Sequence, residues 1–169
     1  ERYHGALLYF NLKKPVKVDG EREYPSSMVS LNAAHKSAGV HVDAEKPFWW
    51  DMPLWIASKQ IHSVGIANNH MWQTGAYRGE GMGRPRDRDR YPRPQGQGFY
   101  CQDIYYHILN SGLRIPPSAG SASGVLPNPV GYNRVYVHTG DKFSWDAWWA
   151  GLRKGRSFVT NGPLLICTV

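Results

Sequence analysis

Short apolar runs alternate with longer stretches of three-to-four spacing along this chain. The short runs predict strands, and the longer stretches predict helices. Strands are expected at 5–12, 40–43, 63–68, 113–120, 133–139 and 156–169. Helices are expected at 26–38, 52–60, 101–111 and 144–152.

The clearest of these helices is the one that begins at Ser144. Serine caps a helix well, and Asp146 in the first turn complements the helix dipole. Phe143 can staple onto Trp148 across the cap. Four apolar side chains fall on one face and predict a packed stripe: Trp145, Trp148, Trp149 and Leu152.

About five alternations of strand and helix predict an α/β domain with a mainly parallel sheet. Ligands of such sheets bind at the carboxyl ends of the strands. By this interpretation, polar clusters at 41–45, 68–70 and 118–123 lie at that edge.

Length and composition set limits on these expectations. The 169 residues suit one α/β domain over 1–169, and 41% of them are hydrophobic, which is enough for a core. No apolar run approaches the roughly 20 residues of a membrane helix, and no signal peptide is visible, so the compartment stays open. Cys101 and Cys167 lack the spacing of a zinc knuckle or a disulfide framework.

The formal charge of +7 raises the question of nucleic acid. Much of the excess lies in a Gly/Pro-rich stretch, 78–98, where Arg alternates with Asp or Pro. This pattern favours an insertion loop that is solvated or covered by an acidic partner over a phosphate-binding arm.

The first polar cluster is His41, Asp43 and Glu45, at every second position of GVHVDAEKP. On an extended segment this spacing places three side chains on one face. Imidazole and carboxylates suit zinc, manganese or iron, or acid/base work. The alternative is a set of solvent-facing residues at a strand end, with Glu45 paired to a cation.

The second cluster, Asn68, Asn69 and His70, ends the next strand. A histidine there can bind metal or transfer protons, and the amides can orient it or a substrate. A structural histidine is the alternative. His35 lies on the apolar face of its helix and is expected in the core.

The third cluster contains Ser118, Ser121 and Ser123 within SAGSASG. Glycine and serine bury too little to form a packed strand or a good helix. Their hydroxyls and backbone N–H groups can bind an anion or a substrate. The stretch is neither a Walker loop nor a G-x-S-x-G elbow, so no catalytic residue is assigned.

Several blocks together resemble the CehA/McbA-type metallohydrolases, the carbaryl-hydrolase-like branch of the PHP superfamily. The strongest are YYHILNSGLRIPPSAGSASGVLPNPVGYNRVYVH and SWDAWWAGLRKGRSFVTNGPLL, with EKPFWWDMPLWIA and VGIANNHM upstream. The resemblance covers about Tyr24 to Leu165, with the blocks in the family's order.

The resemblance implies a distorted (β/α) barrel with a metal cluster, where metal-bound hydroxide attacks a phosphoester, ester, carbamate or amide. Glu45 takes the place of a family histidine, and His70 ends the N-N-H strand. This chain would then be the C-terminal portion of a larger barrel, which is incomplete here. A small-molecule substrate and another chain or segment that completes the barrel are the implied partners.

The sequence also departs from the family pattern. Where the family has G-S-D-x-H, this chain has Gly120 to Gly124, so that Ala122 and Gly124 replace two ligands. Gly65 stands where an acidic residue is common, and no H-x-H pair occurs. Two functions stay open: a metal-dependent hydrolase, or a non-catalytic binding or structural module that has lost metal ligands. Nucleic-acid binding by the basic loop is a third.

Overall fold

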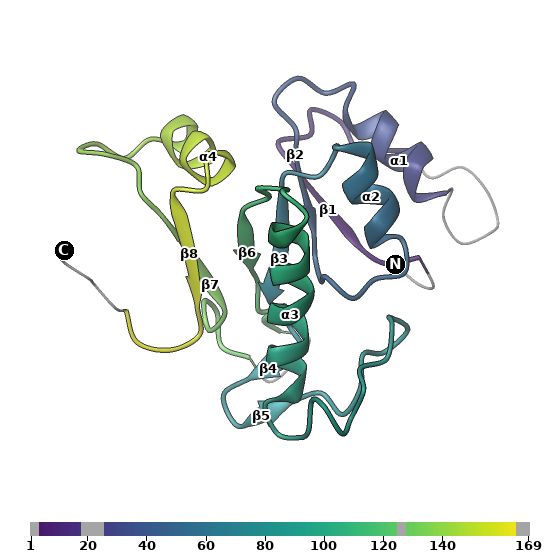
Figure 1. Ribbon diagram of the computed structural model, residues 1–169. Coiled ribbons are helices and arrows are strands. Elements are labelled where there is room, and N and C mark those ends of the chain that lie inside the picture. The colour runs from purple at the N-terminus through teal and green to yellow at the C-terminus, as the bar shows by residue number, and fades with distance from the viewer. Residues whose placement is uncertain (1–3, 18–25, 125–127, 165–169) are drawn as a thin grey trace.

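A computed structural model describes residues 4–17, 26–124 and 128–164 of the chain. Its main sheet has the strand order β1-β2-β3-β6, formed by Leu7–Phe10, His41–Ala44, Ser63–Ala67 and Pro117–Ala119. β2, β3 and β6 are parallel, and β1 is antiparallel at the edge (Figure 1). The prediction of a mainly parallel sheet is confirmed for these strands. Within the described ranges the sheet is open, and the expected barrel stays a proposal.

Three helices cover one face of this sheet: α1 (Ser27–Ala34), α2 (Met52–Ser58) and α3 (Gly96–Asn110). The core between them is apolar and almost free of solvent. It contains, among others, Leu31, Val42, Trp55, Val64 and Ile108. Because side chains alternate along a strand, the residues between these strand positions point to the opposite face.

A second unit stands over that opposite face (Figure 1). It consists of the antiparallel pair β7 (Arg134–Val137) and β8 (Ser157–Thr160), with α4 (Trp145–Arg153) between them in sequence. The Ser144 hydroxyl accepts a hydrogen bond from Ala147 N at 3.1 Å, which confirms the predicted cap. The Arg153 guanidinium donates to the carbonyls of Gly39 and Val40 and so ties α4 to the start of β2.

The apolar stripe predicted for this helix is only partly packed. Leu152 is buried, Trp148 and Trp149 are half-buried, and Trp145 is 69% exposed. Phe143 contacts the Trp145 ring, at 5.3 Å between centroids, rather than making the expected staple with Trp148. Helical spacing identifies residues that share a face, but it does not determine how much of that face is buried.

Two element boundaries differ from the predictions. The strand expected from Leu113 begins at Pro117 as β6. Leu113 and Ile115 precede it and pack on the core instead of pairing with β3. The small residues Ser118 and Ala119 are therefore within a strand, because parallel pairing with β3 supplies the bonds that their side chains cannot. Gly96 starts α3 inside the predicted loop 78–98.

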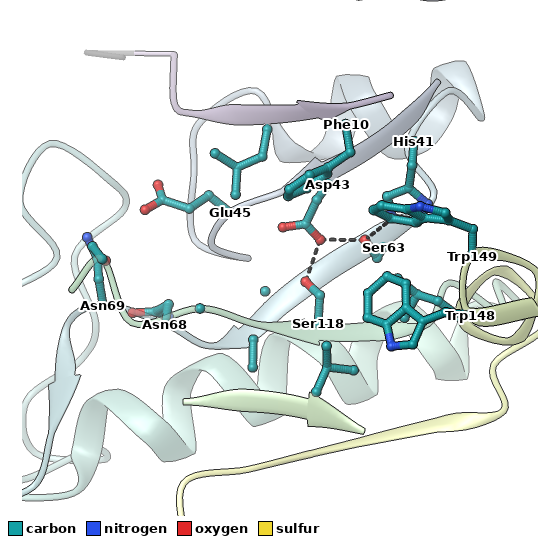
Figure 2. Close-up of a pocket in the computed structure, with 17 residues that line it drawn as sticks. Phe10, His41, Asp43, Glu45, Ser63, Asn68, Asn69, Ser118, Trp148 and Trp149 are labelled. Carbon is teal, nitrogen blue, oxygen red and sulfur yellow. Dashed lines mark hydrogen bonds between the residues drawn. The ribbon is translucent and has the colours of Figure 1, made fainter. Parts of the chain in front are cut away.

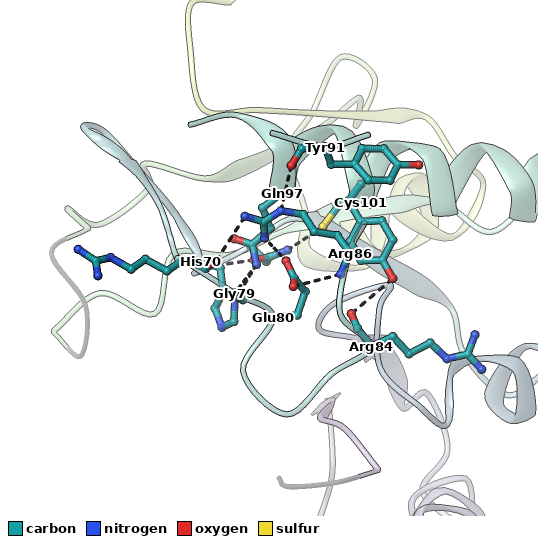
Figure 3. Close-up of polar contacts among 11 residues, drawn as sticks. His70, Gly79, Glu80, Arg84, Arg86, Tyr91, Gln97 and Cys101 are labelled. Atoms are coloured by element: carbon teal, nitrogen blue, oxygen red, sulfur yellow. Dashed lines mark hydrogen bonds and ion pairs between the residues drawn. The ribbon is translucent and has the colours of Figure 1, made fainter. Parts of the chain in front are cut away.

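The rest of loop 78–98 follows the short hairpin of β4 (Met71–Trp72) and β5 (Gly75–Ala76). Its interior holds an ion pair between Arg86 and Glu80, both buried (Figure 3). Arg86 also donates to the Tyr91 carbonyl, at 3.2 Å from Nε. The expectation of a solvated loop is therefore wrong for Arg86, which organises the loop from inside. No helix in the described part of the chain is long and apolar enough to cross a membrane.

Candidate functional site

The face of the main sheet that lies opposite the three helices lines a cavity of about 400 Å³. The strands supply alternate residues to it, which is the direct result of the two-residue period of a strand. Figure 2 shows polar side chains on the sheet side and indoles of α4 across from them. The strand residues on this wall are Leu8, Phe10, His41, Asp43, Ser63, Gly65 and Ser118.

Asp43 is the centre of a hydrogen-bonded group on this wall. The Ser63 hydroxyl donates to Asp43 Oδ1 at 2.5 Å, and the Ser118 hydroxyl donates to the same oxygen. The register explains the first contact, because Ser63 is the neighbour of Asp43 in the β2–β3 ladder. Ser118 pairs with Gly65 of β3. Because Gly65 has no side chain, the Ser118 hydroxyl can cross β3 and reach Asp43.

Gly65 is required at this point for a second reason. A Cβ atom built on it would lie 2.1 Å from the carbonyl oxygen of Glu45. Such an approach is far inside van der Waals contact, so any side chain would push β2 and β3 apart. The residue that stands where the family pattern has an acid thus keeps β2 and β3 in close contact.

His41 extends the group at the start of β2. Its Nε2 lies 2.8 Å from Ser63 Oγ, and because the Ser63 proton goes to Asp43, His41 Nε2–H is the donor in that contact. Its Nδ1 then carries no proton and is buried without a hydrogen-bond partner in the described structure. Burial, then His62 and Arg153, lower the pKa of His41 to about 3, so the ring is neutral at neutral pH.

The pKa of the Asp43 carboxyl is shifted in the opposite direction to that of His41. The residue is 5% exposed, and burial raises its pKa, while the Ser118 and Ser63 hydroxyls oppose that rise. Its second oxygen, Oδ2, receives neither hydroxyl and points away from the two serines in Figure 2. The wall therefore offers one carboxylate oxygen to whatever occupies the cavity.

Glu45 lies beyond the end of β2 and also lines the cavity. Its Oε2 is 2.6 Å from Nζ of Lys46, which is 1% exposed. The ammonium also lies 4.8 Å from the centre of the Trp49 ring. The alternative interpretation is confirmed for the pairing of Glu45 with a cation, Lys46, but its solvent-facing placement is wrong for His41 and Asp43, which are both buried.

Aromatic rings form the opposite wall of the cavity. Trp149 lies 5.5 Å from the Phe10 ring and 4.9 Å from the His41 ring, between centroids. Trp148 meets Trp149 edge-on at 4.7 Å. Sequence analysis assigned Trp148 and Trp149 to a packed stripe and did not connect either with the polar strands. Nor was Ser63 a candidate, although it shares the alternation of SVGIA with Gly65.

The loop that follows β6, residues 120–124, contributes mainly backbone atoms to the lining of the cavity. Gly120 and Ala122 line the cavity, but the Ser121 hydroxyl is bonded to the backbone of Asn133, at 2.8 Å from its N. Ser123 is exposed and does not line the cavity. Ala122 has a φ of 46°, a left-handed conformation that costs a residue with a Cβ and favours Gly, Asn or Asp.

The cluster after β3 divides between two places. Asn68 and Asn69 line the cavity, whereas His70 does not. His70 Nδ1 lies 3.0 Å from the Gln97 amide (Figure 3), and its ring stacks on Tyr77 at 4.9 Å between centroids. Burial, then Lys46, lower the pKa of His70 to about 4. The structure therefore brings His41, Asp43 and Glu45 together and places His70 under the basic loop.

These donors do not fit a metal ion by themselves. Asp43 Oδ1 and His41 Nε2 are already hydrogen-bonded, and Lys46 sets a positive charge beside Glu45. No three His, Cys, Asp or Glu side chains converge as a metal site within residues 4–17, 26–124 and 128–164. A zinc, manganese or iron ion here would need ligands from beyond these residues.

The chain was compared with protein families, curated proteins and solved structures. None of the three comparisons gives a match.

Proposed function

We propose that this chain is part of a PHP-type barrel, similar to the CehA/McbA-type hydrolases, and that the cavity face is the inner wall of that barrel. The parallel arrangement of β2, β3 and β6 supports this proposal. So does the division of the two faces, with helices against one and polar side chains on the other. In a (β/α) barrel the helices form the outer ring, and the functional groups lie at the carboxyl ends of the strands, where Glu45 follows β2 and Asn68 follows β3.

Within that architecture, the proposed function is non-catalytic binding of a small molecule. The observation that carries it is the Asp43 carboxylate, held by two serine hydroxyls on one side and open to a cavity of about 400 Å³ on the other. Small-molecule sites are concave, mostly apolar, and contain a few fixed polar groups. Ala122, in the position of a family ligand, supports binding over hydrolysis because a methyl group cannot hold a metal.

Metal-dependent hydrolysis is the second candidate function. It is favoured by His41 Nδ1, a bare imidazole nitrogen in the same wall as Asp43. Neutral imidazole is a good ligand for zinc, and a carboxylate beside it can complete such a site with ligands from another segment. Phosphoesters, esters, carbamates and amides would be the substrates.

One experiment separates these two functions. The protein is expressed with zinc, manganese and iron supplied, dialysed, and measured for metal content and for turnover of phosphoesters, esters and carbamates. The binding proposal predicts less than about one retained metal per chain and no turnover. Stoichiometric metal, with turnover that is lost in Asp43→Asn and kept in Asp141→Asn, would replace it by hydrolysis. Asp141 is an exposed matched control.

The basic loop is a weaker candidate for nucleic-acid binding. Arg86 is used internally, and Arg90 pairs with Asp103 at 3.1 Å. Both ion pairs reduce the free positive charge that the loop presents.

A further inference from the structure

The chemical class of the ligand can be read from the charges around Asp43, and this inference rests on the proposed binding function. The carboxylate is buried, yet no nitrogen of lysine, arginine or histidine among the described residues lies within 4.0 Å of it. Buried carboxylates in proteins are normally paired with a cation or bound to metal. Asp43 has neutral hydroxyls instead.

Two cations close to this wall, Lys46 beside Glu45 and Arg153 near His41, are already engaged. Lys46 is paired with Glu45, and the Arg153 guanidinium donates to the carbonyls of Gly39 and Val40 at 2.9 and 2.7 Å. Neither can turn to Asp43 without breaking these contacts. An ionised Asp43 therefore has no positive partner among the described residues, and a cationic group that enters the cavity would supply one.

The opposite wall is suited to the same kind of molecule. Trp148 and Trp149 of α4 line the cavity, and aromatic faces attract cations through the negative charge of the ring face. Asn69 Oδ1 has no hydrogen-bond partner among the described residues and can accept from a polar tail, whereas the Asn68 amide is already bonded to His70 N and Cys101 Sγ. A carboxylate that faces aromatic rings is an arrangement by which proteins bind organic ammonium groups.

We infer that the cavity binds a small organic cation, an amine or guanidine, whose charged group contacts Asp43 Oδ2 and whose apolar body lies against Trp148 and Trp149. The charged group donates hydrogen bonds to the carboxylate, and no bond is made or broken. A neutral sugar, which also stacks on indoles and bonds to carboxylates, is the competing ligand class.

Three benzene derivatives of similar size and one sugar test the inference by calorimetry: benzylamine, benzyl alcohol, benzoate and methyl β-glucoside. Benzylamine is expected to bind about tenfold to a hundredfold more tightly than benzyl alcohol, because its hydrogen bond is charged at both ends. Benzoate is expected not to bind. Asp43→Asn, which keeps an acceptor for both serines, should reduce the benzylamine preference to about one.

Two further variants control the result. Asp141 lies outside the cavity, so Asp141→Asn should keep the preference for benzylamine over benzyl alcohol. Trp149→Leu should weaken the binding of benzyl alcohol, methyl β-glucoside and benzylamine alike. Equal binding of benzylamine and benzyl alcohol, tighter binding of the sugar, or a preference that survives in Asp43→Asn would overturn the inference while leaving a binding cavity. Absence of binding by all four probes would instead overturn the proposed function.

Discussion

The hydroxyl of Ser118 provides the sharpest test of how the wall is built. It crosses β3 at Gly65 to donate to Asp43, a contact between residues 75 positions apart. Ser118→Ala removes that donor and leaves only the Ser63 hydroxyl on Asp43 Oδ1. A hydrogen bond to a charged acceptor contributes about 1.5–3 kcal/mol to stability, so the variant should lose a free energy of unfolding in that range.

The same substitution changes the ionisation of Asp43. Hydrogen bonds to a carboxylate favour its charged form, so removal of one donor should raise the pKa of Asp43 further. Urea denaturation measures the first effect, as a loss of about 1 M in midpoint for a domain of this size. A carbon-13 NMR titration of the aspartate carboxyls measures the second. The double variant with Ser63→Ala should lose more than either single variant.

Ser111→Ala is the matched control for this experiment. Its hydroxyl donates to a backbone carbonyl at 2.7 Å, at the exposed end of α3. That variant should change stability by less than about 0.5 kcal/mol. If Ser118→Ala is as mild as Ser111→Ala, and the pKa of Asp43 does not move, the account of a carboxylate held by two serines is wrong.

Three other perturbations test separate parts of the structure. Gly65→Ala should destabilise the protein by about 1–3 kcal/mol in urea denaturation, since its Cβ would lie 2.1 Å from a backbone oxygen; unchanged stability would contradict the close β2–β3 approach. Burial lowers the folded-state pKa of His41 from 6.5 to about 3 and that of His62 from 6.5 to about 4. At a pH between the folded-state pKa and 6.5, each histidine therefore binds a proton when the protein unfolds. Stability should therefore be complete above pH 6.5 and fall as the pH decreases below it, by about 1.4 kcal/mol per pH unit per histidine, and a flat profile of unfolding free energy from about pH 7 to about pH 5 would refute this. Arg86→Met leaves the Glu80 carboxylate buried and unpaired, so limited proteolysis should cut loop 78–98 faster by at least about tenfold; equal rates would show that the ion pair does not order the loop.

The alternation of GVHVDAEKP was enough to predict that His41, Asp43 and Glu45 share a face, because a strand leaves its side chains only two directions. It was not enough to predict the partners. Ser63 and Ser118 reach Asp43 through the register of three parallel strands, and register depends on pairing between distant segments. No local pattern in either segment contains that information.

The same limit explains the aromatic residues and His70. Three-to-four spacing correctly grouped Trp148 and Trp149, but spacing does not say whether a helix face meets a core or a cavity. His70 follows Asn68 and Asn69 directly, yet the turn after β3 directs it toward Gln97 of α3 and away from the cavity. Side-chain direction in a turn depends on backbone angles that sequence spacing does not determine.

The central claim is that a small molecule occupies the cavity between Asp43 and the indoles of α4. Proton–nitrogen NMR of the tryptophan indoles during a benzylamine titration tests it most directly. The account predicts saturable shifts of the Trp148 and Trp149 signals, which require about tenfold to a hundredfold more benzylamine in Asp43→Asn, with Trp72 unaffected because it lines a different cavity. Saturable shifts of Trp72 alone, or no saturable shift of any indole, would contradict it.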